Sequence, residues 1–210
     1  MTRLETEFVA ARQPQSRALL VALHGLGDSA AGYRWLPSAL DLPWMNYLLV
    51  NAPDPYFGGY SWYDFYNPQP DADIARSRQL LFDCLDRQRA DGWPTEQTVL
   101  LGFSQGCLMT WEAGLRYPHR FAGLVGISGY IHQPRQALAE LSPVARAQRF
   151  LITHGTWDPL IPVTQVRTQV KLMQEAGLNI TWHQLPKDHT IAPEELELIR
   201  SFVIAGFSGR

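Results

Sequence analysis

Several features are scarce in this sequence of 210 residues. Its two cysteines, Cys84 and Cys107, are too few for the disulfide framework of a small secreted protein. No apolar run approaches the roughly 18 residues of a membrane-spanning helix. The first residues, Met1 to Glu5, also lack the apolar core of a signal peptide. We therefore expect a cytoplasmic protein without stable membrane insertion.

Positive charge is not in excess either. The chain has 18 Lys and Arg residues against 20 Asp and Glu residues, a net charge of -2, and the basic residues are scattered singly. This argues against a nucleic-acid partner, which would need a basic surface, and against a polybasic membrane patch. Asp28, Asp54 and Asp64 have no His or Cys beside them at ligand spacing, so we expect no metal.

Apolar runs and helical patterns alternate along the chain. The apolar content of 46% is enough for one large core, so residues 1–210 are interpreted as a single domain. Nearly continuous apolar runs predict buried parallel strands at 18–23, 47–51, 98–103, 123–128, 149–154 and 179–184. Apolar residues at helical spacing predict helices at 71–91, at 164–176 and from Pro193 onward, burying Leu196, Ile199 and Val203. This order is typical of an α/β fold with a doubly wound, mostly parallel sheet flanked by helices.

A short glycine-containing stretch carries the strongest chemical signal. Residues 102–106 read G-F-S-Q-G, between a predicted strand and a helical stretch at 108–117. G-x-S-x-G in that context is the nucleophile-elbow signature, in which a sharp turn lifts the serine Oγ clear of the sheet. Glycine and serine are also common turn residues, so the five letters alone could be a chance match. The partners of Ser104 decide between the two.

A serine nucleophile needs a base and an acid to orient that base. Asp158 follows the predicted strand 149–154, and His189 follows the strand 179–184, so both lie at the same sheet edge as Ser104. Serine, acid and histidine in this order are typical of α/β-hydrolases. Asp158 could instead only shape an Asp-Pro turn. Asp188 is a rival acid, but it is adjacent to His189 and points elsewhere more easily.

Two backbone N–H groups should face the oxygen that becomes negative during acyl transfer. Gln105, directly after the serine, supplies one, and Leu26, between Gly25 and Gly27 after the first predicted strand, supplies the other. The G-x-G-x-x-G spacing of a dinucleotide site is absent there. His24 and His154 end predicted strands, where they can cap local backbone.

Together these residues resemble the phospholipase/carboxylesterase family of α/β-hydrolases, which includes the acyl-protein thioesterases. The resemblance covers residues 18–203 and rests on the segments 23–28 (LHGLGD), 61–64 (SWYD), 102–106 and 154–162 and on His189. It implies Ser104 as nucleophile, Asp158 as orienting acid and His189 as base, with the Leu26 and Gln105 amides as oxyanion hole. It also matches Trp62 to a tryptophan beside the active site.

Three positions depart from the family's pattern. Cys107 stands where the family usually has glycine, and we expect it to be a small buried residue rather than a second nucleophile. Thr156 stands where many members carry aspartate. The segment 53–60 is shorter and more aromatic than in the protein thioesterases, so substrate range transfers least well.

We therefore expect a serine hydrolase that cleaves carboxylic esters or thioesters through an acyl-enzyme and needs no cofactor. The expected partner is a small-molecule or lipid-like acyl ester, or an acylated protein; no oligomeric state is predicted. The expected substrate-binding residues are Tyr60, Trp62, Leu160 and Ile161. A peptidase or an acyltransferase with the same triad, and a non-catalytic binding module of the same fold, remain alternatives.

Overall fold

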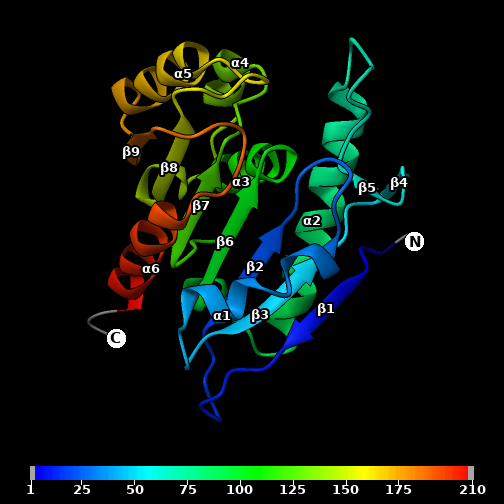
Figure 1. Ribbon diagram of the computed structural model, residues 1–210, viewed down its shortest axis with the longest axis vertical. Coiled ribbons are helices and arrows are strands. Elements are labelled where there is room, and N and C mark those ends of the chain that lie inside the picture. The colour runs from blue at the N-terminus through cyan, green and yellow to red at the C-terminus, as the bar shows by residue number, and fades with distance from the viewer. Residues whose placement is uncertain (1–2, 208–210) are drawn as a thin grey trace.

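The computed structural model describes residues 3–207, and a seven-stranded sheet forms its centre (Figure 1). The strand order is β1-β3-β2-β6-β7-β8-β9. All neighbouring pairs are parallel except β1 with β3. The strands are β1 (Thr6–Val9), β2 (Leu19–Leu23), β3 (Asn46–Val50), β6 (Thr98–Phe103), β7 (Gly123–Ile127), β8 (Arg149–Gly155) and β9 (Asn179–Leu185). The predicted α/β-hydrolase fold with a mostly parallel sheet is confirmed, and the six predicted strands match within about one residue.

Helices cover both faces of the sheet (Figure 1). They are α1 (Leu36–Leu40), α2 (Asp71–Ala90), α3 (Gln105–Arg116), α4 (Pro134–Ala139), α5 (Val163–Glu175) and α6 (Pro193–Phe207), with 3-10 turns η1 (Ala30–Tyr33), η2 (Thr95–Gln97) and η3 (Ala145–Ala147). Side chains of α2, α3 and α5 belong to one hydrophobic core, and those of α1 and α6 belong to a second. The core is therefore split in two by the sheet.

Strand β2 shows why the sheet is apolar throughout. Leu19, Val21 and Leu23 belong to the core on one face, whereas Leu20 and Ala22 belong to the core on the other. Successive side chains in a strand point to opposite faces, so a strand covered on both sides must be apolar at every position. This is the signal by which the parallel strands can be predicted.

Several elements were not predicted, among them the short helices α1 and α4. The edge strand β1 was not predicted, because its burial only alternates between exposed and half-buried. A hairpin of β4 (Asp54–Tyr56) and β5 (Gly59–Ser61) lies between the predicted strand 47–51 and the predicted helix 71–91, where no strand was predicted. In α6, Ile199 and Val203 are buried as predicted, whereas Leu196 is only half-buried.

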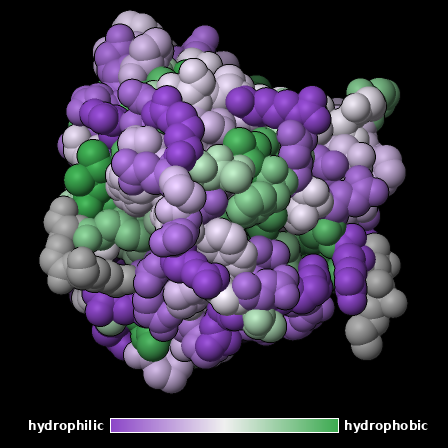
Figure 2. Space-filling model, turned by 90° about the horizontal axis from the view of Figure 1, so that it is seen from below, coloured by the Kyte–Doolittle hydropathy of each residue, from purple (hydrophilic) through white to green (hydrophobic). Residues whose placement is uncertain are grey.

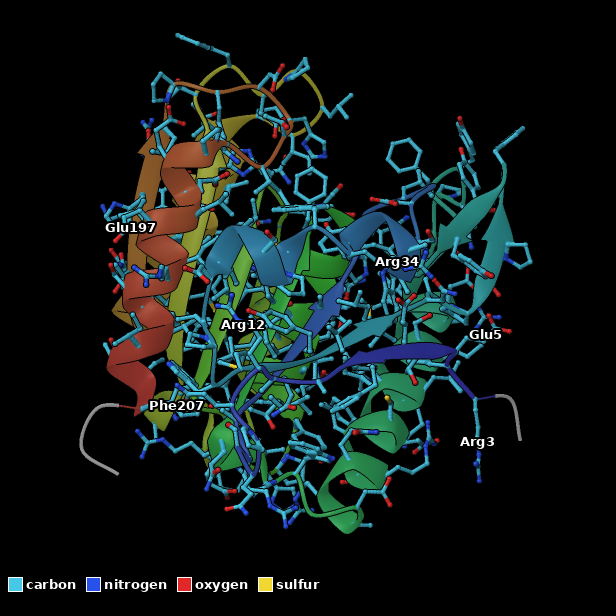
Figure 3. All side chains as sticks on the ribbon, turned by 60° about the horizontal axis from the view of Figure 1, so that its bottom comes forward. Arg3, Glu5, Arg12, Arg34, Glu197 and Phe207 are labelled. Carbon is cyan, nitrogen blue, oxygen red and sulfur yellow. The ribbon has the colours of Figure 1, made fainter. Side chains whose placement is uncertain are left out.

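The face of the molecule that is seen from below is mostly hydrophilic, with hydrophobic patches near its middle and toward its left side (Figure 2). Figure 3 shows Glu5 and Arg34 near β1, with Glu197 and Phe207 on α6 at the opposite side of the molecule. Arg34 forms an ion pair with Glu7 on β1 at 2.7 Å. Charged side chains on an edge strand discourage it from pairing with a strand of another molecule. Over residues 3–207, no helix combines the length and apolarity that crossing a bilayer requires.

Candidate active site

The chain turns sharply between β6 and α3. Ser104, the residue between them, has φ 53° and ψ -115°, a strained backbone conformation. A Cβ atom on Gly102 would lie 2.0 Å from the Gly106 carbonyl oxygen, and one on Gly106 would lie 2.1 Å from the Leu23 carbonyl oxygen. Only glycine fits at either position. The Ser104 N–H donates to the Ile127 carbonyl at 2.9 Å, which holds the turn against β7.

The three predicted side chains of this site lie side by side. His189 Nε2 lies 2.9 Å from Ser104 Oγ, and His189 Nδ1 lies 2.7 Å from Asp158 Oδ2. With the neutral imidazole protonated on Nδ1, the serine hydroxyl donates to Nε2 and Nδ1–H donates to the carboxylate. The residues follow β6, β8 and β9, whose carboxyl ends meet at one edge of the sheet. This arrangement can draw a proton from the serine hydroxyl.

Asp158 is held by its own loop. Its side chain is 0% exposed, and its Oδ1 accepts the N–H groups of Leu160 and Ile161, each at 2.9 Å. Burial disfavours the charged carboxylate, but the hydrogen bonds from Ile161, His189 and Leu160 outweigh it and hold the pKa of Asp158 below its ordinary value. The carboxylate is therefore ionised near neutral pH, with Oδ2 facing His189.

Two further histidines support the site, and the sequence pattern indicated only that they cap backbone. His24 Nε2 accepts the Ala52 N–H at 3.0 Å, so its Nδ1–H donates to the Gly25 carbonyl at 2.6 Å and braces the loop after β2. His154 Nε2 donates to the Ile161 carbonyl at 2.9 Å and lies 3.4 Å from Asp158 Oδ2. Burial lowers the pKa of both rings, so both are neutral near pH 7. The position of His154, four residues before Asp158, was the signal available.

The expected oxyanion-hole residues, Leu26 and Gln105, line the same pocket as Ser104. Among the hydrogen bonds of residues 3–207, neither backbone N–H donates to a protein acceptor. The loop that carries Leu26 is joined to β5, since the Gly27 N–H donates to the Tyr60 carbonyl and the Tyr60 N–H donates to the Asp28 carbonyl, each at 2.9 Å. Both N–H groups are thus free to bind an oxygen in the pocket.

Trp62 does not line this pocket, contrary to the expected role in substrate binding. It is 0% exposed, and its Nε1–H donates to the His24 carbonyl at 3.0 Å. The Trp62 backbone N–H donates to Gln105 Oε1 at 2.9 Å. The other end of that side-chain amide, Gln105 Nε2, donates to the Tyr63 carbonyl at 3.0 Å. Trp62 therefore supports the loops behind the site. Gln105 joins them to α3, a second role that its motif did not reveal.

Tyr60 also lies outside the pocket. Its hydroxyl faces Glu5 at 3.4 Å near β1, because the alternation along β5 turns it away from Ser104. Leu160 and Ile161 do line the pocket, as expected. A family resemblance can place a residue in a segment near the active site, but it does not determine to which side of a strand the side chain points.

The pocket over Ser104 has a volume of about 450 Å³ and mostly aromatic walls. Its lining residues are Gly25, Leu26, Asp28, Tyr56, Tyr63, Phe65, Tyr66, Phe103, Ser104, Gln105, Tyr130, Leu160, Ile161 and His189. The buried hydroxyl of Tyr63 lies 3.1 Å from that of Tyr130 at the inner end, and Phe65, Tyr66 and Leu160 are exposed at the mouth. Such a pocket suits an apolar group with one polar atom.

The two departures near the site have local explanations. Thr156 Oγ1 donates to the Leu185 carbonyl at 3.2 Å, which joins β8 to the end of β9. An aspartate, which is acceptor-only when ionised, could not make this bond. Cys107 is fully buried, and a Cβ atom on Gly126 or Gly129 would lie within 2.8 Å of it. Burial raises the pKa of the Cys107 thiol to about 12, which is typical of an unreactive structural cysteine.

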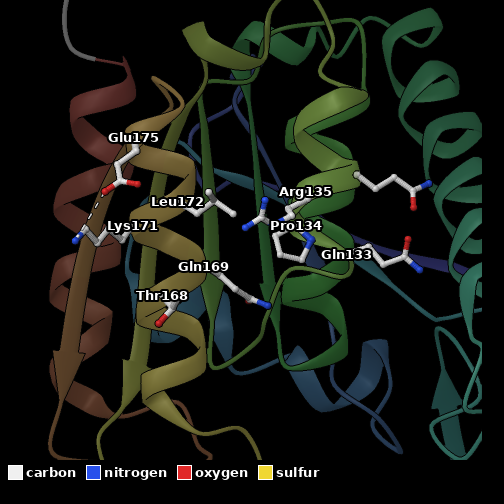
Figure 4. A pocket seen from close by; sticks show the side chains of 9 residues that line it. Gln133, Pro134, Arg135, Thr168, Gln169, Lys171, Leu172 and Glu175 are labelled. Carbon is white, nitrogen blue, oxygen red and sulfur yellow. Dashed lines mark ion pairs between the residues drawn. The ribbon is translucent and has the colours of Figure 1, made fainter.

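A larger hollow lies elsewhere, between α4 and α5, with a volume of about 720 Å³ (Figure 4). Lys171 and Glu175, two of its lining residues, form an ion pair at 3.8 Å, and no side chain of the Ser104 site lines it. Within residues 3–207, no group of three or more His, Cys, Asp or Glu side chains could hold a metal ion.

Comparisons with known proteins show the family of this chain. The model of the phospholipase/carboxylesterase family matches residues 4–205. Acyl-protein thioesterase 1 of Schizosaccharomyces pombe is 34% identical over 161 residues, 69% of this chain and 70% of that protein. A probable carboxylesterase of Oryza sativa subsp. japonica is 27% identical over 218 residues, 96% of this chain and 82% of that protein. The crystal structure of esterase PE8 superposes with a TM-score of 0.85 at 26% identity, covering 97% of this chain and 99% of the other.

Proposed function

We propose a catalytic triad of Ser104, His189 and Asp158 for this chain, which belongs to the phospholipase/carboxylesterase family of α/β-hydrolases. Membership of this family makes the protein an enzyme that hydrolyses esters or thioesters. The observation that carries the proposal is the pair of contacts on one imidazole, 2.9 Å to Ser104 Oγ and 2.7 Å to Asp158 Oδ2. Each contact is within hydrogen-bond reach, which a nucleophile and its base require.

The reaction has two halves. Ser104 Oγ attacks the acyl carbonyl carbon while His189 Nε2 takes the hydroxyl proton, and Asp158 stabilises the imidazolium that forms. The bond from the carbonyl carbon to the alcohol oxygen or thiol sulfur then breaks, and His189 returns the proton to that leaving atom. Water attacks the acyl-enzyme in the same way, with His189 as base, and releases the carboxylic acid and free Ser104.

The carbonyl oxygen becomes negative in each half and needs donors. The backbone N–H groups of Leu26 and Gln105 supply them, both free of protein acceptors within residues 3–207. One such donor is worth roughly a hundred- to thousandfold in rate. The bracing of the Leu26 loop by His24 and β5 supports a hole that is formed before substrate binds.

The acyl part of the substrate lies in the aromatic pocket, against Leu160 and Ile161. The names of the relatives, carboxylesterase and acyl-protein thioesterase, support a small or lipid-like acyl ester or an acylated protein as substrate. The two cysteines, both buried as free thiols, fit a reducing compartment, which supports the cytoplasm as the location.

The test is the removal of the nucleophile. Ser104→Ala should lower the turnover of p-nitrophenyl acetate by about a millionfold, because no other group can form the acyl-enzyme. A fluorophosphonate probe should label the wild-type protein and not this variant. The matched control is Ser201→Ala, an exposed serine on α6 that should leave both readouts unchanged. Normal turnover by Ser104→Ala would refute the triad. A wild-type protein that the probe leaves unlabelled and that does not hydrolyse the ester would also refute it, and would favour a binding module.

A further inference from the structure

A second hollow adjoins the pocket over Ser104 and shares the His189 side chain with it. Its volume is about 270 Å³, and its lining residues are Asp28, Tyr33, Trp35, Phe103, His189, Thr190 and Ile191. Asp28, Phe103 and His189 also line the pocket over Ser104. The Phe103 ring centre lies 5.0 Å from that of His189, and both rings line both hollows. The base of the proposed triad is therefore part of the wall of two adjoining spaces.

The proposed mechanism assigns different parts of the substrate to these spaces. The leaving oxygen or sulfur must lie next to His189 Nε2, because that atom returns the proton to it. The pocket over Ser104 extends inward to Tyr63, which is 4% exposed, and suits the acyl part. The group bonded to the leaving atom then extends over His189, toward the second hollow.

The walls of the second hollow combine aromatic faces with an unpaired negative charge. Trp35 is 39% exposed there, and its ring centre lies 6.1 Å from that of the buried Tyr33. Asp28 is exposed, and its Oδ1 accepts the Ser29 N–H at 2.7 Å. No Lys or Arg among residues 3–207 forms an ion pair with Asp28. A carboxylate beside an aromatic face is the chemistry that recognises an organic cation.

We propose that this second hollow is the leaving-group subsite and that it favours alcohols or thiols that carry a quaternary or protonated amine. The cation lies between the Trp35 ring and the Asp28 carboxylate while the leaving atom faces His189. This inference rests on the proposed triad, because it takes the position of the leaving atom from that mechanism.

The experiment compares two esters that differ only in charge, butyrylcholine and 3,3-dimethylbutyl butyrate. The wild-type enzyme should have a kcat/KM about three- to tenfold higher for the choline ester, given the strength of one exposed cation–π contact and one exposed ion pair. The ratio should shrink as salt is added, because exposed charges are screened. It should fall toward one in Asp28→Asn, which keeps the acceptor for the Ser29 N–H, and in Trp35→Leu.

Two controls make the result specific. Asp188→Asn removes an exposed carboxylate next to His189 that lines neither hollow, and it should keep the wild-type ratio. In an ester of betaine with an uncharged alcohol, the cation is on the acyl part instead of the leaving group. Such an ester should lose the higher kcat/KM that the cation gives to the choline ester. The proposed subsite is wrong if the wild-type enzyme has a ratio of the two kcat/KM values, choline ester over neutral ester, of one or less. It is wrong as well if Asp28→Asn and Trp35→Leu keep the full wild-type ratio, or if Asp188→Asn lowers the ratio as much as they do. It is also wrong if neither butyrate ester is cleaved. Labelling of Ser104 by the fluorophosphonate tells these failures apart from failure of the triad.

Discussion

The Asp158 carboxylate divides its two oxygens between two tasks. Oδ1 accepts two N–H groups of its own loop, and Oδ2 accepts from His189. Because Oδ1 is occupied, Oδ2 is directed at the imidazole, and its charge selects the tautomer with the proton on Nδ1. The adjacent Asp188, the rival acid in the sequence, is exposed, and the structure brings Asp158 to the ring instead.

Replacing Asp158 by Asn should lower kcat by about ten-thousandfold, because an amide N–H facing Nδ1 favours the tautomer in which Nε2 cannot accept the serine proton. Steady-state kinetics with p-nitrophenyl acetate measures this. Asp188→Asn is the control of equal chemistry and should stay close to wild type. A similar loss of kcat in both variants would mean that the negative charge near His189, rather than the oriented contact of the Asp158 carboxylate, supports catalysis.

The loop between β9 and α6 carries His189, and a buried ion pair holds it. Lys187 is 6% exposed, and its ammonium donates to Ser128 Oγ at 3.0 Å, to the Thr190 carbonyl and to the Glu195 carboxylate at 2.8 Å. Glu195, fully buried on α6, also accepts the Ala192 N–H at 2.8 Å. These bonds lie on both sides of His189 in the chain and connect its loop to the end of β7 and to α6.

Lys187→Met should lower the free energy of unfolding by about 3–5 kcal/mol, because it leaves the Glu195 carboxylate buried without a partner. It should also lower kcat more than it changes KM, since displacing a catalytic group by about 1 Å can cost a hundredfold in rate. Urea denaturation and steady-state kinetics measure the two effects.

The double variant Lys187→Met/Glu195→Gln should be more stable than Lys187→Met alone, because the glutamine is uncharged and can still accept the Ala192 N–H. Lys171→Met, on the exposed face of α5, is the control and should change little. A Lys187→Met protein with wild-type stability and kcat would show that the ion pair does not position the loop.

At the scale of the whole molecule, the site lies where the chain reverses its direction across the sheet. From β2 the sheet grows to β3 on one side, and from β6 it grows through β9 on the other. A crevice forms beyond the carboxyl ends of the strands at such a switch point. Leu26 follows β2 on one side of the reversal, and Asp158 and His189 follow β8 and β9 on the other. Activity therefore depends on the packing of both halves.

The buried histidines of the two halves predict how stability depends on pH. Burial lowers the pKa of His24 and His154 in the folded protein, so between about pH 6.5 and their folded pKa values the unfolded chain binds more protons. Their contribution to stability is full above about pH 6.5 and is lost as the pH falls. The lowered pKa of Asp158 acts in the same direction at more acidic pH.

The midpoint of thermal denaturation should therefore be lower at pH 5.5 than at pH 7.5. In His154→Gln, which lacks one of the two titrating rings, the difference between the two pH values should be smaller, whatever the variant's stability at pH 7.5. Differential scanning calorimetry in matched ionic strength measures both. An equal or higher midpoint at pH 5.5 in the wild-type protein would contradict the assignment of these rings as neutral.

The sequence predicted the parts of this protein that depend on local pattern. Strands covered on both faces are apolar at every position, so six of them could be found, whereas the edge strand β1 has no such signal. The elbow could be found because only glycine fits at residues 102 and 106. A charged residue is normally exposed, so nothing in the pattern indicated that Lys187 is buried against Glu195.

The residue types and their order along the chain thus determined the fold and indicated the three residues of the proposed triad, because buried strands and close backbone contacts restrict which residue types can occur. Only the tertiary structure decided which way each side chain points. It turned Trp62 behind the site, placed His154 against Asp158, and made His189 part of the wall of two hollows. The reason is physical: packing of segments distant in the chain selects these orientations, and the residue types alone are compatible with several.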